Sequence, residues 1–293
     1  MQPRPQKTIA KPVEFQGRGL FHGIEARVTL RPADADTGIV FQRIDLPDRP
    51  DIPARCEFVA TVPRRTVIAN GEGNSVETVE HLMSALAGLQ VDNCIVEINA
   101  PEVPAYDGSC LDFCQGILEA GTQQLREPAL VVNTDRQTTV RSPDGKQTLK
   151  LRPYIHGCPA FTYHLDYGAR STVAAQEFSV EITPESFFNE IAAARTFVLE
   201  SEIKALQSMG YGTHLTAKDI VIVGNNGVVD NELRWQNEGV RHKILDCIGD
   251  LALSGRAFCG HVTACRSGHH VNHKLAAELA SMKLQSGLRT RAA

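Results

Sequence analysis

The clearest hydrophobic pattern in the chain lies between residues 240 and 253. At about 100° per residue, one side of a helix here collects apolar side chains, namely Val240, Ile244, Cys247, Ile248 and Leu251. His242, Asp246 and Asp250 recur every four residues, so they form a stripe roughly opposite, with neighbours about 6 Å apart. Leu245 and Gly249 flank this stripe with little polarity. The pattern predicts a helix buried on two sides, with one side holding a polar site.

A second helix is predicted over residues 76–88, with Ser75 as its N-cap and Gly88 at its end. Its core face consists of Val79, Leu82, Met83 and Leu86. Glu80 and His81 point away from that face, and their neighbours there are small: Ser84, Ala85 and Ala87. Two interpretations stay open, because an acid and a histidine here form either an exposed pair or part of a packed site.

The remaining elements repeat a similar order in two halves. Predicted strands lie at 26–32, 38–43, 91–98, 129–141, 146–152, 160–167, 219–223 and 257–264. Predicted helices lie at 109–120, 186–193, 199–208 and 270–284. A polar stretch at 122–130 divides the halves, which predicts two α+β domains, residues 1–126 and 127–293. No sequence repeat is strong enough to prove a duplication.

Composition narrows the function classes. The chain has 293 residues and a net charge of −4, which argues against a general nucleic-acid binder. No run of 18 apolar residues predicts a membrane span, and the N-terminus has no signal-peptide pattern, so a cytoplasmic protein is expected. The eight cysteines form no Cys-x-x-Cys pair and are expected to be reduced. A metal would therefore need histidine and carboxylate ligands.

The two helices together offer such ligands. Two histidines and one aspartate from different helices would leave an open position on zinc. A nearby carboxylate can take a proton from water activated at such a site, and Glu80 is suited to that role. From spacing alone the alternative stands, since His-x-x-x-Asp on a helix is often an ordinary polar face.

Two more segments carry candidate chemistry. His269 opens the last predicted helix after Gly268, where it could protonate a leaving group while Asp250 orients it. The alternative is a surface histidine at a helix start. In Ala194-Arg195-Thr196-Phe197, the hydroxyl of Thr196 could hold an oxyanion, or the segment is a plain turn.

Taken together, these stretches resemble the bacterial UDP-3-O-acyl-N-acetylglucosamine deacetylase family of lipid A biosynthesis, from the Gly17–Gly23 loop to Ser267–Leu275. The motifs that carry the resemblance are Thr78-Val79-Glu80-His81-Leu82, Ala100-Pro101-Glu102-Val103-Pro104-Ala105-Tyr106-Asp107-Gly108-Ser109, Ala194-Arg195-Thr196-Phe197, Val240-Arg241-His242-Lys243-Ile244-Leu245-Asp246-Cys247-Ile248-Gly249-Asp250-Leu251 and Ser267-Gly268-His269.

The resemblance implies one zinc ion per chain, held by His81, His242 and Asp246. It implies Glu80 as general base, and His269 as general acid positioned by Asp250. Thr196 would help to hold the oxyanion.

For the substrate, the resemblance implies a UDP-linked acylated amino sugar. Lys243 would meet substrate charge and Phe197 would line the sugar site. An apolar passage for the acyl chain is implied at 198–215, where Leu199 and Ile203 would supply part of the wall. The implied fold is two similar two-layer α/β sandwich domains packed with their helices facing, with the active site between them.

One motif departs from the family pattern. The Gly-Leu-His-x-Gly loop reads Gly19-Leu20-Phe21-His22-Gly23 here, so His22 is assigned no role. Two rivals remain: a zinc amidase for a different N-acyl substrate, and a non-catalytic paralogue that binds a nucleotide sugar. We expect no nucleic-acid partner, and a monomer.

Overall fold

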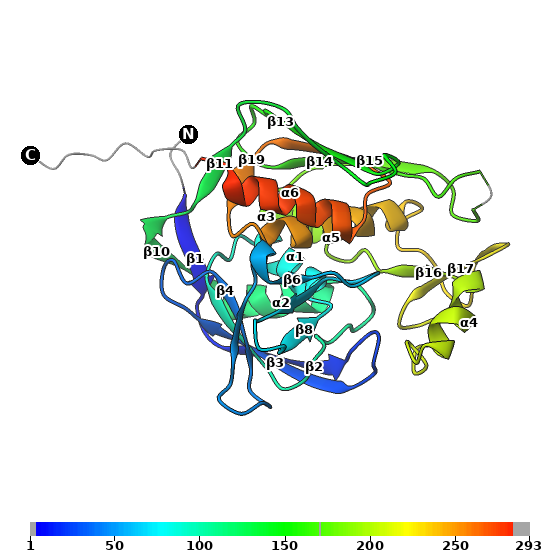
Figure 1. Ribbon diagram of the computed structural model, residues 1–293, viewed down its shortest axis with the longest axis horizontal. Coiled ribbons are helices and arrows are strands. Elements are labelled where there is room, and N and C mark those ends of the chain that lie inside the picture. The colour runs from blue at the N-terminus through cyan, green and yellow to red at the C-terminus, as the bar shows by residue number, and fades with distance from the viewer. Residues whose placement is uncertain (1–3, 170, 284–293) are drawn as a thin grey trace, which may run out of the picture.

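The computed structural model describes residues 4–169 and 171–283, and it has two five-stranded sheets with helices between them. Figure 1 shows the layers: one sheet at the bottom, then α1 and α2, then α5 and α6, and the second sheet at the top. The helices of the two halves face each other, and α1 packs directly against α5. The expected α+β class with facing helical layers is confirmed.

The first sheet has the strand order β2-β3-β9-β4-β5. Its strands are β2 (Val13–Arg18), β3 (Glu25–Pro32), β9 (Cys94–Ile98), β4 (Ile39–Arg43) and β5 (Asp51–Pro53). All neighbours are antiparallel except β4 and β9. Alternate residues face the helices α1 (Glu80–Gly88) and α2 (Leu111–Ala120), as a half-buried sheet requires.

The second sheet has the order β12-β13-β20-β14-β15. Its strands are β12 (Thr138–Arg141), β13 (Thr148–Arg152), β20 (His261–Cys265), β14 (Ala160–Leu165) and β15 (Gln176–Glu181). Only β14 and β20 are parallel, so order and directions match those of the first sheet. Its main helices are α5 (Glu238–Ala252) and α6 (His269–Ser281), with α3 (Pro184–Glu190) beside them. The two halves therefore share one plan.

Smaller elements complete the fold. The short strands and helices are β1 (Pro5–Ile9), η1 (Cys56–Phe58), β6 (Val59–Ala60), β7 (Val67–Ala69), β8 (Ser75–Glu77), β10 (Thr122–Pro128), β11 (Val131–Asn133), β16 (Phe197–Leu199), α4 (Glu200–Ser208), β17 (Val221–Gly224), β18 (Gly227–Val228) and β19 (Ala257–Cys259). The polar stretch at the expected domain boundary is largely the strand β10, which pairs with β1. The boundary itself stays a prediction.

The predicted helix over 76–88 is wrong at its start. Ser75–Glu77 is the strand β8, because it pairs with β7. Thr78 then has a φ of 58°, in the left-handed region, and the helix begins only at Glu80. Glu80 and His81 consequently lie in the first turn of α1.

Two predicted strands were also too long. Residues 129–141 form β11 and β12, which belong to different sheets, and residues 257–264 fall into β19 and β20. Gly260 stands between the latter two, where a Cβ would lie 2.6 Å from a side-chain atom of Leu151. The last helix ends at Ser281 rather than Leu284, and Leu284 lies outside the described residues.

The contact between α1 and α5 positions the site. The predicted apolar faces of both helices are buried in one continuous core. At Gly249 a Cβ would lie only 2.0 Å from the backbone oxygen of Glu80, so α5 can approach the start of α1 this closely only with glycine there. Among residues 4–169 and 171–283, no helix is long and apolar enough to span a membrane.

Candidate active site

The contact between α1 and α5 brings His81, His242 and Asp246 together. One potential donor atom from each lies within 4.8 Å of the others. The distance from Asp246 Oδ1 is 3.2 Å to His242 Nε2 and 3.7 Å to His81 Nε2. All three residues are buried. The predicted packed site is therefore present, and neither His81 nor Asp246 belongs to an exposed polar face.

The hydrogen bonds within this group suit a metal ion. Burial lowers the pKa of His242, so its ring is neutral at pH 7. Its Nδ1 lies 3.0 Å from the carbonyl oxygen of Ala194, and a proton donated there leaves a lone pair on Nε2. Asp246 Oδ1, which faces that lone pair, is buried without a hydrogen-bond partner among the described residues. Two buried acceptors facing each other favour a cation between them, and a His₂Asp set is one that zinc accepts.

Glu80 lies beside this group but makes different contacts. Its Oε2 accepts a hydrogen bond from the backbone N–H of Thr66 at 3.0 Å, and its Oε1 is 3.8 Å from His269 Nε2. Burial raises the pKa of Glu80 to about 7. A carboxyl group with this pKa can both accept and release a proton near neutral pH, as a general base must.

His269 is held by Asp250. Its Nδ1 lies 2.8 Å from Asp250 Oδ2, which turns Nε2 toward Glu80. Burial opposes the charge of the ring, but the carboxylate of Asp250 outweighs it and raises the pKa of His269 to about 10. His269 is therefore protonated at neutral pH and can act as an acid.

Asp250 has more partners than the sequence suggested. It is fully buried and accepts from Thr66 Oγ1 at 2.6 Å and Asn272 Nδ2 at 2.8 Å, besides His269. His273 Nε2 lies 3.3 Å from Asp250 Oδ1 and 3.0 Å from Thr66 Oγ1. Neither Thr66 nor His273 was predicted from the sequence. The i,i+4 spacing of His269 and His273 could have indicated the latter, whereas nothing local marks Thr66.

Asp250, His269 and His273 also bring donor atoms within 4.8 Å of one another. This second group differs from the first, because its carboxylate oxygens are already hydrogen bonded to Thr66, His269 and Asn272. The unsatisfied acceptor belongs to the first group. The first group is therefore the better metal site.

Thr196, the predicted oxyanion residue, and the predicted substrate residue Phe197 lie at the start of β16, whereas the predicted substrate residue Lys243 lies on α5. Thr196 lies two residues after Ala194; its N–H donates to Gly108 O at 2.8 Å and its carbonyl accepts from Val221 N at 3.0 Å. Lys243 Nζ donates to Asp246 Oδ2 at 2.8 Å and lies 5.7 Å from the centre of the Phe197 ring. Lys243 is therefore adjacent to the group formed by His81, His242 and Asp246, which is called the metal-type group from here on.

The predicted passage residues lie farther along the chain. Leu199 ends β16 and Ile203 lies in α4, and both are half-buried. Figure 1 shows β16, β17 and α4 together at one side of the layers. His22 Nε2 lies 3.2 Å from Glu77 Oε2, and His22 is not part of the metal-type group.

The chain is similar to known proteins over nearly its whole length. The family model described as "LpxC: UDP-3-O-acyl N-acetylglycosamine deacetylase" matches residues 6–281. A UDP-3-O-acyl-N-acetylglucosamine deacetylase of Geobacter sp. (strain M21) is 40% identical over 94% of this chain and 88% of its own length. A protein with the same description from Anaeromyxobacter sp. (strain Fw109-5) is 38% identical over 92% of this chain and 86% of its own. The chain therefore belongs to the LpxC family of UDP-3-O-acyl N-acetylglycosamine deacetylases.

Proposed function

We propose that this protein removes acetate by hydrolysis from UDP-3-O-acyl-N-acetylglucosamine, a step in lipid A biosynthesis. Family membership supports the reaction and the substrate class. The observation that carries the proposal for this chain is the acid–base pair Glu80 and His269, with 3.8 Å between Glu80 Oε1 and His269 Nε2. This pair lies beside the metal-type group. An amide hydrolase needs a base for the attacking water and an acid for the leaving amine, and this arrangement offers both.

The metal-type group would hold one zinc ion through His81, His242 and Asp246. The unsatisfied Oδ1 of Asp246 and the neutral His242 support this assignment. When bound, zinc lowers the pKa of water to about 7 and polarises a carbonyl group.

Glu80 would remove the proton from the attacking water, since its pKa is raised to about 7. His269 would give its proton to the amine nitrogen as the C–N bond breaks, and Asp250 would hold the ring in place. The hydroxyl of Thr196 would donate to the oxyanion that forms at the amide carbonyl. The products are acetate and the free amino sugar nucleotide.

Substrate contacts would come from the segments next to the metal-type group. Lys243 would meet substrate charge, and Phe197 would line the sugar site because its ring lies near Lys243. Leu199 and Ile203 would border the acyl chain. We place the protein in the cytoplasm, acting as a monomer on this small molecule.

The test is acetate release from UDP-3-O-acyl-N-acetylglucosamine, measured together with the zinc content of the protein. Glu80→Gln keeps the shape of the side chain but removes the base, so zinc is expected to stay while turnover falls by at least about 100-fold. Glu119→Gln, at an exposed position of α2, is the matched control and should change neither value. Undiminished deacetylation by Glu80→Gln would remove the base assignment. Equal turnover of the same sugar without UDP would favour a different N-acyl substrate.

A further inference from the structure

Glu238 lies one turn before His242 on α5, so it extends the polar stripe of this helix to four members. Its carboxylate is fully buried and accepts hydrogen bonds from the Arg195 backbone N–H at 3.1 Å and from the Arg195 Nε at 2.7 Å and Nη2 at 3.0 Å. A further bond comes from the backbone N–H of Arg234 at 2.7 Å. The hydrogen-bonding capacity of the Glu238 carboxylate is thus used within the protein, and Glu238 does not belong to the acid–base pair of Glu80 and His269.

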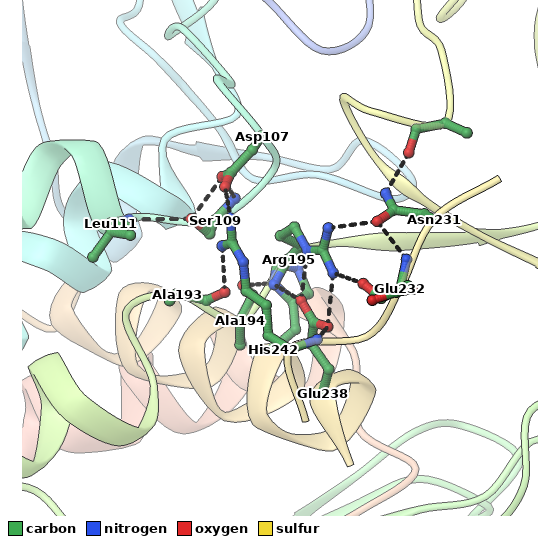
Figure 2. A network of polar contacts seen from close by, with 12 residues as sticks. Asp107, Ser109, Leu111, Ala193, Ala194, Arg195, Asn231, Glu232, Glu238 and His242 are labelled. Carbon is green, nitrogen blue, oxygen red and sulfur yellow. Dashed lines mark hydrogen bonds and ion pairs between the residues drawn. The ribbon is translucent and has the colours of Figure 1, made fainter. Parts of the chain in front are cut away.

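Arg195, the partner of Glu238, is also buried and makes several hydrogen bonds. The residue is 6% exposed. Besides Glu238, its guanidinium donates to Asn231 Oδ1 at 3.1 Å and to the carbonyl oxygen of Glu232 at 2.6 Å, as Figure 2 shows. A buried ion pair is costly unless its hydrogen bonds are complete, and removing one partner leaves an uncompensated charge. Here each of the three guanidinium nitrogens has a hydrogen-bond partner, so the pair favours one orientation of the backbone at Arg195.

That backbone is the one that contacts the proposed metal ligand. The carbonyl of Ala194 and the N–H of Arg195 belong to the same planar peptide unit. The carbonyl lies 3.0 Å from His242 Nδ1, while the N–H donates to Glu238. One peptide unit therefore spans a turn of α5, with His242 at one end and Glu238 at the other.

The preceding peptide is bonded by Arg234, which also links it to Asp107 in the first half of the chain. Arg234 donates to the carbonyl oxygen of Ala193 at 2.7 Å and pairs with Asp107 at 2.5 Å. Asp107 in turn accepts from Ser109, and these contacts lie on the opposite side of the segment in Figure 2. The Asp107–Arg234 pair is partly exposed, so it holds the segment less strongly than the buried pair does.

We propose that Arg195 and Glu238 act as a positioning pair that holds the Ala194–Arg195 peptide, so that its carbonyl accepts the Nδ1 proton of His242 and Nε2 is presented to the metal. This inference rests on the metal site of the proposed function. Neither residue touches the metal or the substrate. Loss of such an outer partner weakens metal binding by about 10- to 100-fold.

The test measures the zinc dissociation constant of the metal-free full chain by competition with a chromophoric chelator. Glu238→Gln keeps the shape of the side chain but loses the charge that holds Arg195. We expect it to bind zinc about 10- to 100-fold more weakly, and turnover should recover largely at saturating zinc. ¹⁵N NMR of histidine-labelled, metal-free protein should also show a smaller population of the Nδ1–H tautomer at His242.

The matched control is Glu190→Gln. Glu190 ends α3 and pairs at 2.6 Å with Arg241, which lies on α5 next to His242. Among the described residues, no hydrogen bond links Glu190 or the Arg241 side chain to the Ala194–Arg195 peptide. We expect wild-type zinc affinity and an unchanged His242 tautomer. Arg195→Lys is the second variant: it keeps the charge but loses the forked contact, so its effect should lie in the same direction.

The outcomes separate the two proposals. If Glu238→Gln and Arg195→Lys fold and bind zinc as tightly as the wild type, the positioning pair is refuted while the metal site stands. If the wild type itself binds no zinc, the metal site of the proposed function fails, and the positioning pair with it. A lower melting temperature with unchanged zinc affinity of the folded protein assigns the pair a structural role only and refutes the proposal.

Discussion

The two halves of the molecule have the same sheet, yet their corresponding helices contribute to the site in different ways. α1 and α5 each precede the central strand of their sheet, β9 and β20. α1 contributes Glu80 and His81 from its first turn, directly after the left-handed Thr78. α5 contributes His242, Asp246 and Asp250 from three successive turns. A repeated scaffold therefore supplies the contact between the halves, and the side chains make the site asymmetric.

The helices that follow the central strands differ as well. α6 begins with His269, whereas α2 begins with Leu111 and contributes no residue to the groups described above. A positive charge at a helix N-terminus is disfavoured by the helix dipole. Asp250 on the neighbouring α5 has to outweigh both this effect and burial to keep His269 protonated. The charge of the acid thus depends on the contact between helices, not on its own helix.

The largest expected effect comes from removing the ligand contributed by α1. We expect His81→Ala to lose stoichiometric zinc, because loss of a direct ligand should exceed the roughly 100-fold cost of losing an outer partner. Metal analysis after dialysis measures this. His270→Ala, one residue after His269 and exposed, is the control. Full zinc retention by His81→Ala would remove this residue from the ligand set.

The next effect tests the helix contact itself. A Cβ at Gly249 would lie 2.0 Å from the Glu80 backbone oxygen, so Gly249→Ala must push α1 and α5 apart. Overpacking of this kind costs about 1–3 kcal/mol, and we expect the free energy of unfolding to fall by that amount, measured by urea denaturation. Gly71→Ala is the control, because a Cβ there meets nothing within 4 Å. Equal stability of the two variants would show that the helices do not depend on this close approach.

A further effect is expected at the hydrogen bond between Thr66 and Asp250, which joins the two halves beside Glu80 and His269. Thr66→Val keeps the backbone N–H that bonds Glu80 but removes the hydroxyl that bonds Asp250. A lost hydrogen bond to a buried charge costs about 1.5–3 kcal/mol, so we expect kcat at saturating zinc to fall by about tenfold or more. Thr66→Ser keeps the hydroxyl and should retain most of the activity. Equal kcat for Val and Ser would exclude a role for the hydroxyl.

The last effect concerns the pH dependence of the free energy of unfolding. The pKa of His269 is about 10 in the folded protein and about 6.5 when unfolded, so its pairing with Asp250 stabilises the fold fully below pH 6.5. This contribution is lost as the pH rises through 10. The difference in free energy of unfolding between metal-free wild type and His269→Gln should therefore shrink from pH 6.5 to pH 10. A constant difference across this range would mean that the ring is not charged in the folded state.

Local patterns predicted the parts of the site that lie on one helix. The spacing of His242, Asp246 and Asp250 was enough to place them on one stripe, because i,i+4 neighbours meet on any α-helix. Apolar periodicity also identified the buried faces of α1 and α5. It did not find the start of α1, since the pairing of β8 with β7 outweighed the helical pattern.

Only the tertiary structure decided which distant groups complete the site. Thr66 bonds Asp250 across 184 positions of sequence, and Arg195 pairs with Glu238 across 43. The sequence determined that a polar stripe would be enclosed by apolar residues, but burial removes water as an alternative partner, and the fold then supplies the partners. Hydrogen bonds of this kind depend on the approach of separate segments, which Gly249 permits between α1 and α5 and which no local periodicity records.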